Sequence, residues 1–329
     1  MKVGITYALR QAWLDEGYTL DETAEFDRPD TIDAIENALR TLGYQADRIG
    51  RAQDLIARLA RGDRWDIVFN IAEGLRGFAR EAQVPAILDV YGIPCTFSDA
   101  LIMALTLHKG MTQRVVRAMG IPTPDFAVIE RAEDAARLQM PFPLFVKPVA
   151  EGTGKGVSPR SKADSAEHLV AVCRDVIATY HQPALVETYM PGREFTVGIL
   201  GTGAKARAVA AIEVILKAEA EAHAYSYVNK EECEELVIYE LCDDALAREA
   251  KQVALAAWRA LGCRDAGRID LRADAQGRPR FLEVNPLAGL HPQHSDLPIL
   301  CAKAGMTYVE LIDAIMRSAC ERVGAAPSR

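Results

Sequence analysis

Two short apolar segments near the C-terminus carry polar side chains at alternating positions. Arg268 and Asp270 lie in one segment, Glu283 and Asn285 lie in the next, and a turn signal, DAQG, separates them. If the segments pair as a hairpin, residues two apart share a face, so two carboxylates, an amide and a guanidinium converge where the faces coincide. Carboxylate and amide oxygens suit Mg²⁺. Because the carboxylates lie among Ile, Leu, Phe and Val, a metal site is favoured over a solvated face with ordinary ion pairs.

A glycine-rich loop follows another apolar segment. It runs from Lys147 to Val157 with the sequence KPVAEGTGKGV, which has three glycines in five residues. Glycines let successive backbone N–H groups turn toward an anion, and Lys147 and Lys155 add positive charge there. The ending and the spacing of a Walker A motif are missing. Taken alone, the loop predicts phosphate binding and a plain surface hairpin about equally.

The composition argues against several classes of partner. The chain has 329 residues, half of them hydrophobic, with a formal net charge of −8 and a pI near 5.4. This length predicts two or three packed domains, and the acidic balance disfavours nucleic acid or an anionic membrane as a partner. The seven cysteines are odd in number and widely spaced, which is typical of reduced thiols in the cytoplasm. We recognise no signal peptide and no apolar run long enough to span a membrane.

The elements that must position these residues begin with alternating strand and helix patterns. Strands are predicted at 3–7, 44–49 and 67–71, and helices at 31–42, around 55–59 and at 81–91. Asp30 is expected to cap the first helix and Gly43 to end it. This order predicts a parallel sheet covered by helices.

Two further blocks follow. Helices are predicted at 109–119, 168–178, 243–261 and 308–319, and strands at 126–129, 144–147, 184–189, 195–200, 209–214, 236–239, 267–271 and 280–284. The acidic segment 217–235 is interpreted as a mobile loop. The fold class is therefore α/β, with α+β character in the C-terminal part. We place the domains at residues 1–98, 99–189 with the glycine loop, and 190–329 with the acidic hairpin.

These features occur in a fixed order together with further matches. From about Trp65 to Leu311 the chain resembles the ATP-grasp superfamily and, within it, the D-alanine–D-alanine ligase group. The ordered set of motifs is highly specific, although no single one is decisive. The matching residues are GIPCTFS at 92–98, ALTLHK at 104–109, GIPTP at 120–124, FVKP at 145–148, EGTG at 151–154, VETYM at 186–190, GREFTV at 192–197, GRID at 267–270, EVN at 283–285 and HS at 294–295.

The resemblance implies an ATP-grasp fold, in which two domains clamp ATP beside the N-terminal parallel-sheet domain. Lys109 and Lys147 would hold the phosphates. Two Mg²⁺ ions, which Mn²⁺ can replace, would be bound by Asp270, Glu283 and Asn285. The flap over the phosphates would be Glu151, Gly152, Thr153 and Gly154, where this group usually has Ser in place of Thr153. Adenine and ribose would be held by Glu187, Thr188, Tyr189, Met190 and Glu194.

The implied reaction has two steps. A carboxylate attacks the γ-phosphate and becomes an acyl phosphate, and an amine then attacks the acyl carbon while Arg268 meets the developing oxyanion. The chain is thus expected to be a cytoplasmic, ATP-dependent carboxylate–amine ligase for amino acids, and a homodimer by analogy with the family. Two alternatives stay open: a ligase for other amino acids in a secondary pathway, and a non-catalytic ATP-binding protein of the same fold.

The family motifs that bind the amino-acid substrates differ in this chain. The family's glycine-rich loop after the first strand is absent, and Glu22 and Glu25 are the nearest candidate carboxylates, of which Glu25 is assigned to the substrate. The family's H-G-x-x-G-E-D-G motif is replaced by EGLRG at 73–77, with Arg80 and Glu81 where E-D would fall. In the lid loop of the family a Tyr usually follows a Lys, but here Lys230 is followed by Glu231, with Tyr225 and Tyr227 nearby. Lys230 is assigned to catalysis together with Thr153 and Arg268.

Three smaller signals complete the assignment. Gly289, His294 and Ser295 are expected to border the pocket of the second substrate. His291 and His294 form an H-x-x-H pattern, but zinc is disfavoured because no third ligand is apparent. Cys233 has no visible partner base, so it is not assigned as a nucleophile, and the glutamates around it indicate a solvated lid surface.

Overall fold

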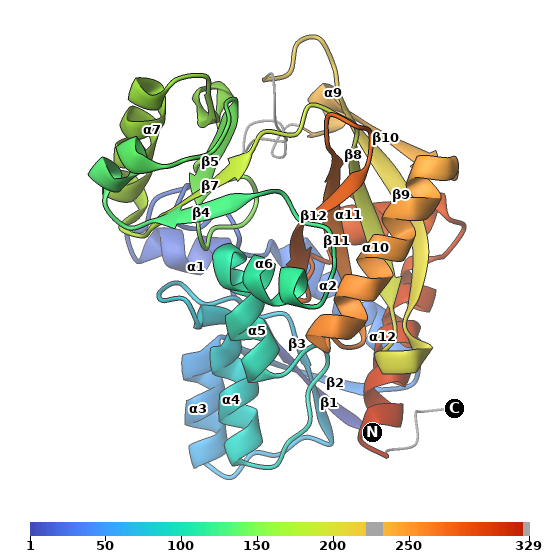
Figure 1. Cartoon of the computed structure of the whole chain (residues 1–329). Helices are drawn as coiled ribbons and strands as arrows, with labels where there is room; N and C mark the ends of the chain where they lie inside the picture. Colours follow the sequence, from blue (N-terminus) through green and yellow to red (C-terminus); the bar gives the residue numbers. More distant parts are fainter. Residues whose placement is uncertain (222–232, 325–329) are drawn as a thin grey trace.

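A three-stranded parallel sheet forms the N-terminal part of the protein in the computed structural model, which describes residues 1–221 and 233–324 (Figure 1). Its strands are β1 (Lys2–Thr6), β2 (Gln45–Gly50) and β3 (Ile67–Asn70), in the order β2-β1-β3. All four residues of β3 are buried. A parallel sheet with such strands needs cover on both faces, which the sequence predicted from its strand–helix order.

Helices supply that cover. Ile67 and Phe69 point into the core with α2 and α12, whereas Val68 points into the core with α3 and α4. This alternation follows from the two-residue period of a strand. The helices here are α1 (Arg10–Asp15), α2 (Pro29–Thr41), α3 (Ala52–Ala60), η1 (Arg80–Ala82), α4 (Gln83–Val90), α5 (Ala100–Leu107) and the C-terminal α12 (Tyr308–Arg322).

An antiparallel sheet of short strands forms the central part. The strand order is β4-β7-β5-β6, and the core beneath α7 holds Leu144, Val146 and Val186. The elements are α6 (Lys109–Ala118), β4 (Phe126–Ile129), η2 (Ala132–Arg137), β5 (Leu144–Pro148), η3 (Pro159–Ser161), β6 (Lys162–Ala163), α7 (Ala166–Tyr180) and β7 (Ala184–Thr188). The glycine loop leaves the end of β5 at this sheet.

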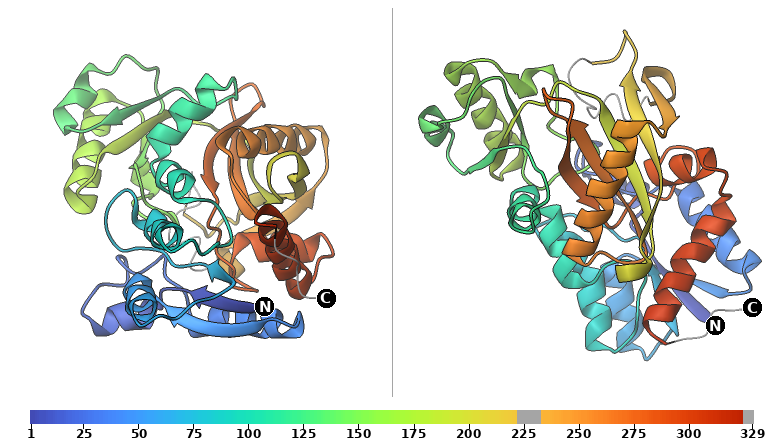
Figure 2. Two further views of the ribbon diagram at one scale, coloured as in Figure 1. Left: turned by 90° about the horizontal axis from the view of Figure 1, so that it is seen from below. Right: turned by 45° about the vertical axis from the view of Figure 1, so that its right-hand side comes forward.

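A five-stranded antiparallel sheet, in the order β10-β9-β8-β11-β12, forms the C-terminal part. Helix α10 covers one face, as Figure 2 shows, and α11 and α12 lie toward the N-terminal sheet. Small residues and Trp258 of α10 pack against the strands. The elements are β8 (Glu194–Leu200), η4 (Gly203–Lys205), β9 (Arg207–Leu216), α9 (Cys233–Leu236), β10 (Val237–Cys242), α10 (Ala245–Leu261), β11 (Ala266–Ala273), β12 (Pro279–Asn285) and α11 (Asp296–Lys303).

The C-terminal helix ties the first and last parts of the chain together. The Arg322 guanidinium donates hydrogen bonds of 2.8 Å to the Cys95 carbonyl and to the Asp265 carboxylate. Asp265 is fully buried and also accepts from the Phe97 backbone N–H at 2.8 Å. Within the described residues no helix has the length and apolar character needed to cross a membrane.

The mixed architecture of parallel and antiparallel sheets confirms the predicted fold class, and the predicted helices and strands are present to within a few residues of their ends. One detail was wrong: α2 begins at Pro29, and Asp30 lies in its first turn rather than at the cap. Proline fits the first helical position, where its missing N–H costs nothing. Helices α1, α5 and α11 were not predicted, and neither was α9, which begins at Cys233 within the segment 217–235 that was interpreted as a loop. The domain boundaries near residues 98 and 189 stay a prediction.

Candidate active site

The predicted acidic hairpin is formed by β11 and β12. In its register Asp270 lies opposite Glu283 and Arg268 lies opposite Asn285. A bulge follows Asp270, so the pairing resumes between Leu271 and Phe281. The four polar side chains that sequence alternation assigned to shared faces are therefore brought together at one end of the hairpin.

Cations and a hydroxyl group surround Asp270. Its carboxylate accepts from the Arg268 guanidinium and from the Thr196 hydroxyl, the latter at 2.9 Å. The Arg268 Nε atom also lies 3.4 Å from an Asp296 carboxylate oxygen. Burial disfavours the charged form of Arg268, but the carboxylates of Asp270 and Asp296 outweigh it and raise its pKa. Arg268 is thus a fixed positive charge beside the hairpin.

The donor set at this hairpin fits magnesium. Asp270 and Glu283 offer carboxylate oxygens and Asn285 an amide oxygen, all hard ligands. Among the residues that the structure describes, no three His, Cys, Asp or Glu side chains gather as a complete metal cage. Mg²⁺ does not need one, because it is usually bound by one or two carboxylates, waters and substrate phosphates. These residues therefore suit a metal that arrives together with a nucleotide.

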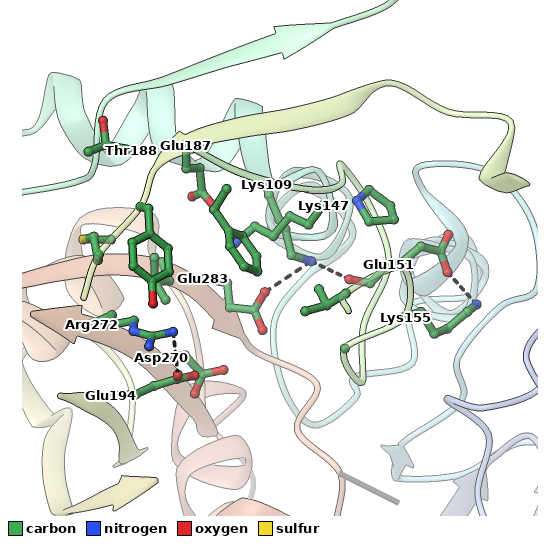
Figure 3. A pocket seen from close by; sticks show the side chains of 17 residues that line it. Lys109, Lys147, Glu151, Lys155, Glu187, Thr188, Glu194, Asp270, Arg272 and Glu283 are labelled. Carbon is green, nitrogen blue, oxygen red and sulfur yellow. Dashed lines mark hydrogen bonds and ion pairs between the residues drawn. The ribbon is translucent and has the colours of Figure 1, made fainter. Parts of the chain in front are cut away.

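Two lysines face this hairpin from other elements. Lys109, the first residue of α6, places its Nζ atom 3.3 Å from a Glu283 oxygen and donates to the Glu151 carbonyl at 2.5 Å, as Figure 3 shows. Lys147 on β5 lies 2.7 Å from Glu187. Burial opposes its charge, but Glu187 and Glu283 prevail and raise the pKa of Lys147. Both predicted phosphate-binding lysines thus line the same pocket.

The glycine loop makes the turn that the sequence predicted. Gly154 and Gly156 have φ values of 74° and 73°, which suit glycine. Thr153 has φ 48°, an unusual value for a β-branched residue, and its Oγ1 is buried with no hydrogen-bond partner among the described residues. Strain and an unsatisfied hydroxyl in a loop are typical of a functional position.

The N-terminal part of the chain holds this loop. The Gly152 N–H donates to Glu25 Oε1 at 2.5 Å, and Arg80 lies 3.0 Å from the other Glu25 oxygen. A Cβ on residue 152 would lie 2.9 Å from Glu25 Oε1, so a side chain there would displace the Glu25 carboxylate. Glu151 accepts from Gln182 at 2.6 Å and pairs with Lys155 at 2.5 Å. Glu25, assigned from the sequence, therefore lies at the flap.

One pocket collects the predicted nucleotide-binding residues (Figure 3). Glu194 lies 3.3 Å from Arg272 there, and the Phe145 and Tyr189 rings lie 6.4 Å apart. These groups supply flat apolar surface and polar partners, as a nucleoside requires. The predicted residues that line it are Lys109, Lys147, Glu151, Gly154, Glu187, Thr188, Tyr189, Met190, Glu194, Asp270 and Glu283.

A second cavity, of about 250 Å³, opens beside the first. Both cavities are bordered by Lys109, Glu151 and Glu283, so they meet at the lysine predicted to bind phosphate and the carboxylate predicted to bind metal. The predicted residues that line the second cavity are Glu25, Gly152, Thr153, Arg268, Asn285, Gly289, His294 and Ser295. A group bound here would face a phosphate bound in the first.

The H-x-x-H pattern orders a loop of this second cavity. His291 Nδ1 accepts from the Gln293 and His294 backbone N–H groups at 3.1 Å, and His291 Nε2 lies 3.2 Å from Asp30. Ser295 accepts from the His291 N–H at 3.0 Å. Both ring nitrogens of His291 thus have partners that shape the loop.

Sequence reasoning missed three residues of the site. Gln113 donates to Glu187, Arg272 pairs with Glu194, and Asp296 pairs with Arg268. For two of these residues, their spacing from a predicted site residue could have indicated their role. Arg272 follows Asp270 by two residues on the same strand face, and Gln113 lies one helical turn after Lys109. Asp296 had no such signal.

Part of the predicted lid lies outside the described residues. This holds for Lys230, assigned to catalysis, and for Tyr225, Tyr227 and Glu231. The described chain resumes with α9 at Cys233, whose side chain is likewise outside the description.

Comparison with known proteins adds independent findings. A family model described as "D-ala D-ala ligase C-terminus" matches residues 115–317. The chain is 30% identical over 323 residues to the D-alanine–D-alanine ligase of Bordetella petrii, with 97% of this chain and 93% of that protein covered. It is 33% identical over 285 residues to the D-alanine–D-alanine ligase of Pseudomonas putida, with 86% and 85% covered.

A solved structure shares the fold. The D-alanine–D-alanine ligase of Bacillus anthracis, complexed with ATP, superposes with a TM-score of 0.72 at 22% identity and covers 98% of both chains. At this identity the likeness concerns the fold, which extends over nearly the whole chain.

Proposed function

We propose that this chain, which belongs to the D-alanine–D-alanine ligase family, joins two amino acids through an acyl phosphate. The acyl phosphate would form where the two cavities meet. The chain is an ATP-dependent ligase that forms a carbon–nitrogen bond, and it uses a divalent metal with ATP. The observation that carries the proposal is the shared border of Lys109, Glu151 and Glu283 between a nucleoside-lined pocket and a polar cavity. A γ-phosphate at this border would face a carboxylate bound in the second cavity.

The metal-binding residues in this proposal are Asp270, Glu283 and Asn285, which would hold two Mg²⁺ ions. A bound metal neutralises phosphate charge in the transition state of phosphoryl transfer. Lys109 and Lys147 would bind the phosphate oxygens, and the flap at 151–154 would exclude water from the phosphates.

In the first step an oxygen of the substrate carboxylate attacks the γ-phosphorus, the bond to the bridging β–γ oxygen breaks, and ADP leaves. Phosphoryl transfer needs positioning and neutralisation of charge more than covalent help from the protein. The buried Lys109 ammonium supports this role, since it joins the Glu283 carboxylate to the flap carbonyl of Glu151. The Thr153 hydroxyl, which lacks a partner in the described residues, is available to donate to the transferred group.

In the second step the amine nitrogen attacks the acyl carbon, loses a proton, and inorganic phosphate leaves with one oxygen of the original carboxylate. The tetrahedral intermediate carries an oxyanion, and Arg268 is held beside this position by Asp270 and Asp296. Gly289, His294 and Ser295 would border the amine substrate. Lys230 is proposed to act from the lid.

The relatives are named for D-alanine, which is therefore the first candidate for either substrate. A ligase for other amino acids is the second candidate, and a specific contact favours it. Arg80 and Glu81 stand where the family motif has an acidic pair, so one of the two acidic residues is replaced by a cation. Arg80 pairs with Glu25 at the flap, and the wall that meets the substrate has therefore changed its charge pattern. We propose a cytoplasmic homodimer by analogy with the family, which sedimentation of the purified chain would test.

The test of the proposed function is a panel of D- and L-amino acids, offered singly and in pairs with ATP and Mg²⁺. ADP release is measured, and the condensed product is identified by mass spectrometry. Dipeptide formation with stoichiometric ADP is the expected result. Tight ATP binding without ADP release across the panel would favour the non-catalytic alternative.

A further inference from the structure

The second cavity has an N-terminal wall of unusual charge. We define this wall as Glu25, Asp27, Glu73 and Glu81 together with Arg10 and Arg80. The carboxylates and Arg10 line the cavity, and Arg80 lies directly behind Glu25. The residues come from the segments after β1 and β3 and from η1, far from the metal-binding hairpin in sequence.

The guanidinium groups of the wall already have acceptors. Arg80 pairs with Glu25 at 3.0 Å, and both side chains are more than nine-tenths buried. Arg10 donates to the backbone carbonyls of Thr23 and Ala24, at 3.2 and 2.6 Å. The nearby Arg28 pairs with Asp30 at 3.5 Å, outside the wall.

The remaining carboxylates are different. In the described part of the chain, Asp27, Glu73 and Glu81 have no hydrogen bond or ion pair from a side chain, yet all three face the same cavity. Burial raises the pKa of Glu81 to about 7 against the opposing charges of Arg80 and Lys109, and burial raises that of Asp27 to about 8 against the opposing charge of Arg10. Among the described residues, no cation is therefore directly bonded to these three carboxyls.

A second polar group in the same cavity also lacks a partner. Thr153 Oγ1, on the flap, is buried without a hydrogen bond among the described residues. It lies one residue from Gly152, which is bonded to Glu25. An orphaned buried hydroxyl beside the wall indicates that a bound molecule completes the hydrogen bonds here.

A count of charges then identifies what that molecule must carry. A bound cation lowers the pKa of a neighbouring carboxyl and so keeps it ionised. With every group of the wall ionised in this way, four carboxylates oppose two guanidinium groups. An amino acid with a neutral side chain brings one ammonium group, which leaves the wall one positive charge short. The carboxylate of that amino acid is directed to Lys109 and Arg268, away from the wall. Charges removed from water must be paired, or the site loses binding energy.

We infer that the amino acid bound against this wall carries a second cationic group, an ammonium or a guanidinium on its side chain, which pairs with Glu73 and Glu81. This inference rests on the proposed function, because it names the substrate class of the same site. The α-ammonium pairs at Glu25 and Asp27, the carboxylate faces the phosphate, and the basic side chain extends toward Glu73 and Glu81.

The experiment compares isosteric pairs of substrates at fixed ATP and Mg²⁺. Arginine is tested against citrulline and lysine against norleucine, in both enantiomers and each with alanine as partner, by ADP release and product mass. We expect kcat/KM for the basic member to exceed that of its neutral isostere by about tenfold or more. The Glu73→Gln and Glu81→Gln variants should reduce this ratio to about threefold or less.

Glu22→Gln is the matched control, because Glu22 is exposed, bonds to Thr19 and lies outside the second cavity. It should leave the ratio unchanged, and thermal melting verifies that every variant is folded. Turnover of neutral amino acids at rates equal to or above those of the basic ones overturns the inference but leaves the ligase intact. A ratio that persists in the doubly substituted Glu73→Gln, Glu81→Gln protein also overturns it. No ADP release with any substrate overturns the proposed function itself.

Discussion

Asp270 and Glu283 lie directly opposite each other across the β11–β12 pair, immediately before a bulge. Like charges in such a cross-strand position are normally destabilising. Here Arg268 and Thr196 contact the first carboxylate, and Lys109 lies 3.3 Å from the second. These contacts offset the repulsion between the two carboxylates, which in the proposed function would offer two hard oxygen donors to a metal bound with the nucleotide.

The first prediction concerns the metal. Glu283→Gln removes one charge from the donor set but keeps the size of the side chain, so phosphoryl transfer should fall by about 10² or more while the fold survives. ADP release and thermal melting measure the two effects. Glu240→Gln, at an exposed position of β10, is the control and should keep its activity. Near-normal ADP release by Glu283→Gln would remove the metal assignment.

The second prediction concerns the buried pair of Lys147 and Glu187, 2.7 Å apart. Lys147→Met leaves the Glu187 carboxylate without its cation, so the free energy of unfolding should fall by about 3 kcal/mol. The KM for ATP should rise at least about tenfold, since one phosphate contact is lost. Denaturant titration and steady-state kinetics test the two parts. Lys205→Met, which breaks an exposed ion pair with Glu321, should change neither.

The third prediction concerns the contact between the flap and the N-terminal wall. Glu25→Gln keeps an oxygen for the Gly152 N–H but removes the nearest counter-charge of Arg80 and leaves only Glu151 at 4.0 Å. Because Glu25 faces the second cavity, the KM of the amino acid should rise by about tenfold, and more than the KM of ATP. Equal increases in both constants would mean that Glu25 acts only through the flap.

The fourth prediction concerns stability against pH. Asp274, in the β11–β12 turn, accepts from the Gln276 and Arg278 backbone N–H groups and from Arg280. Burial alone would raise its pKa, but these bonds lower it from 3.8 to about 2. A folded pKa below the unfolded one stabilises the protein above pH 3.8, and this contribution disappears as the pH falls toward 2.

Asp274→Asn should therefore cost about 1 to 2 kcal/mol of unfolding free energy at pH 7, since part of the carboxylate faces solvent. The deficit should shrink between pH 4 and pH 2. Urea titrations of both proteins across this range measure it, and a deficit independent of pH would show that the charge is not the cause.

The sequence predicted those parts of the fold that depend on local pattern. The β11–β12 hairpin follows from alternation around Asp270 and Glu283, and the flap turn follows from its glycines. Helix α5 was missed because its sequence, ALIMALTL, is apolar on nearly every side and shows no helical period, and α1 was missed because six residues are too few for one. Asp30 was misplaced because Pro29 starts the helix.

The contacts that complete the site were beyond such reasoning. The Gly152–Glu25 bond joins residues 127 apart in sequence, and Arg80 reaches Glu25 from another element 55 residues away. The hydrophobic periodicity of a helix or strand does not indicate such a long-range pairing. The pairing depends on how the N-terminal part of the chain packs on the flap. The motifs of the nucleotide pocket could be identified because they lie on single strands or loops, whereas the substrate wall is assembled from several segments.

The most direct test of the account follows oxygen atoms. A substrate of the ligase is labelled with ¹⁸O in both carboxylate oxygens, and the inorganic phosphate released with ADP is analysed by mass spectrometry. An acyl phosphate formed where the two cavities meet must transfer one ¹⁸O to each phosphate. Unlabelled phosphate, released together with the condensed product, would contradict the central claim.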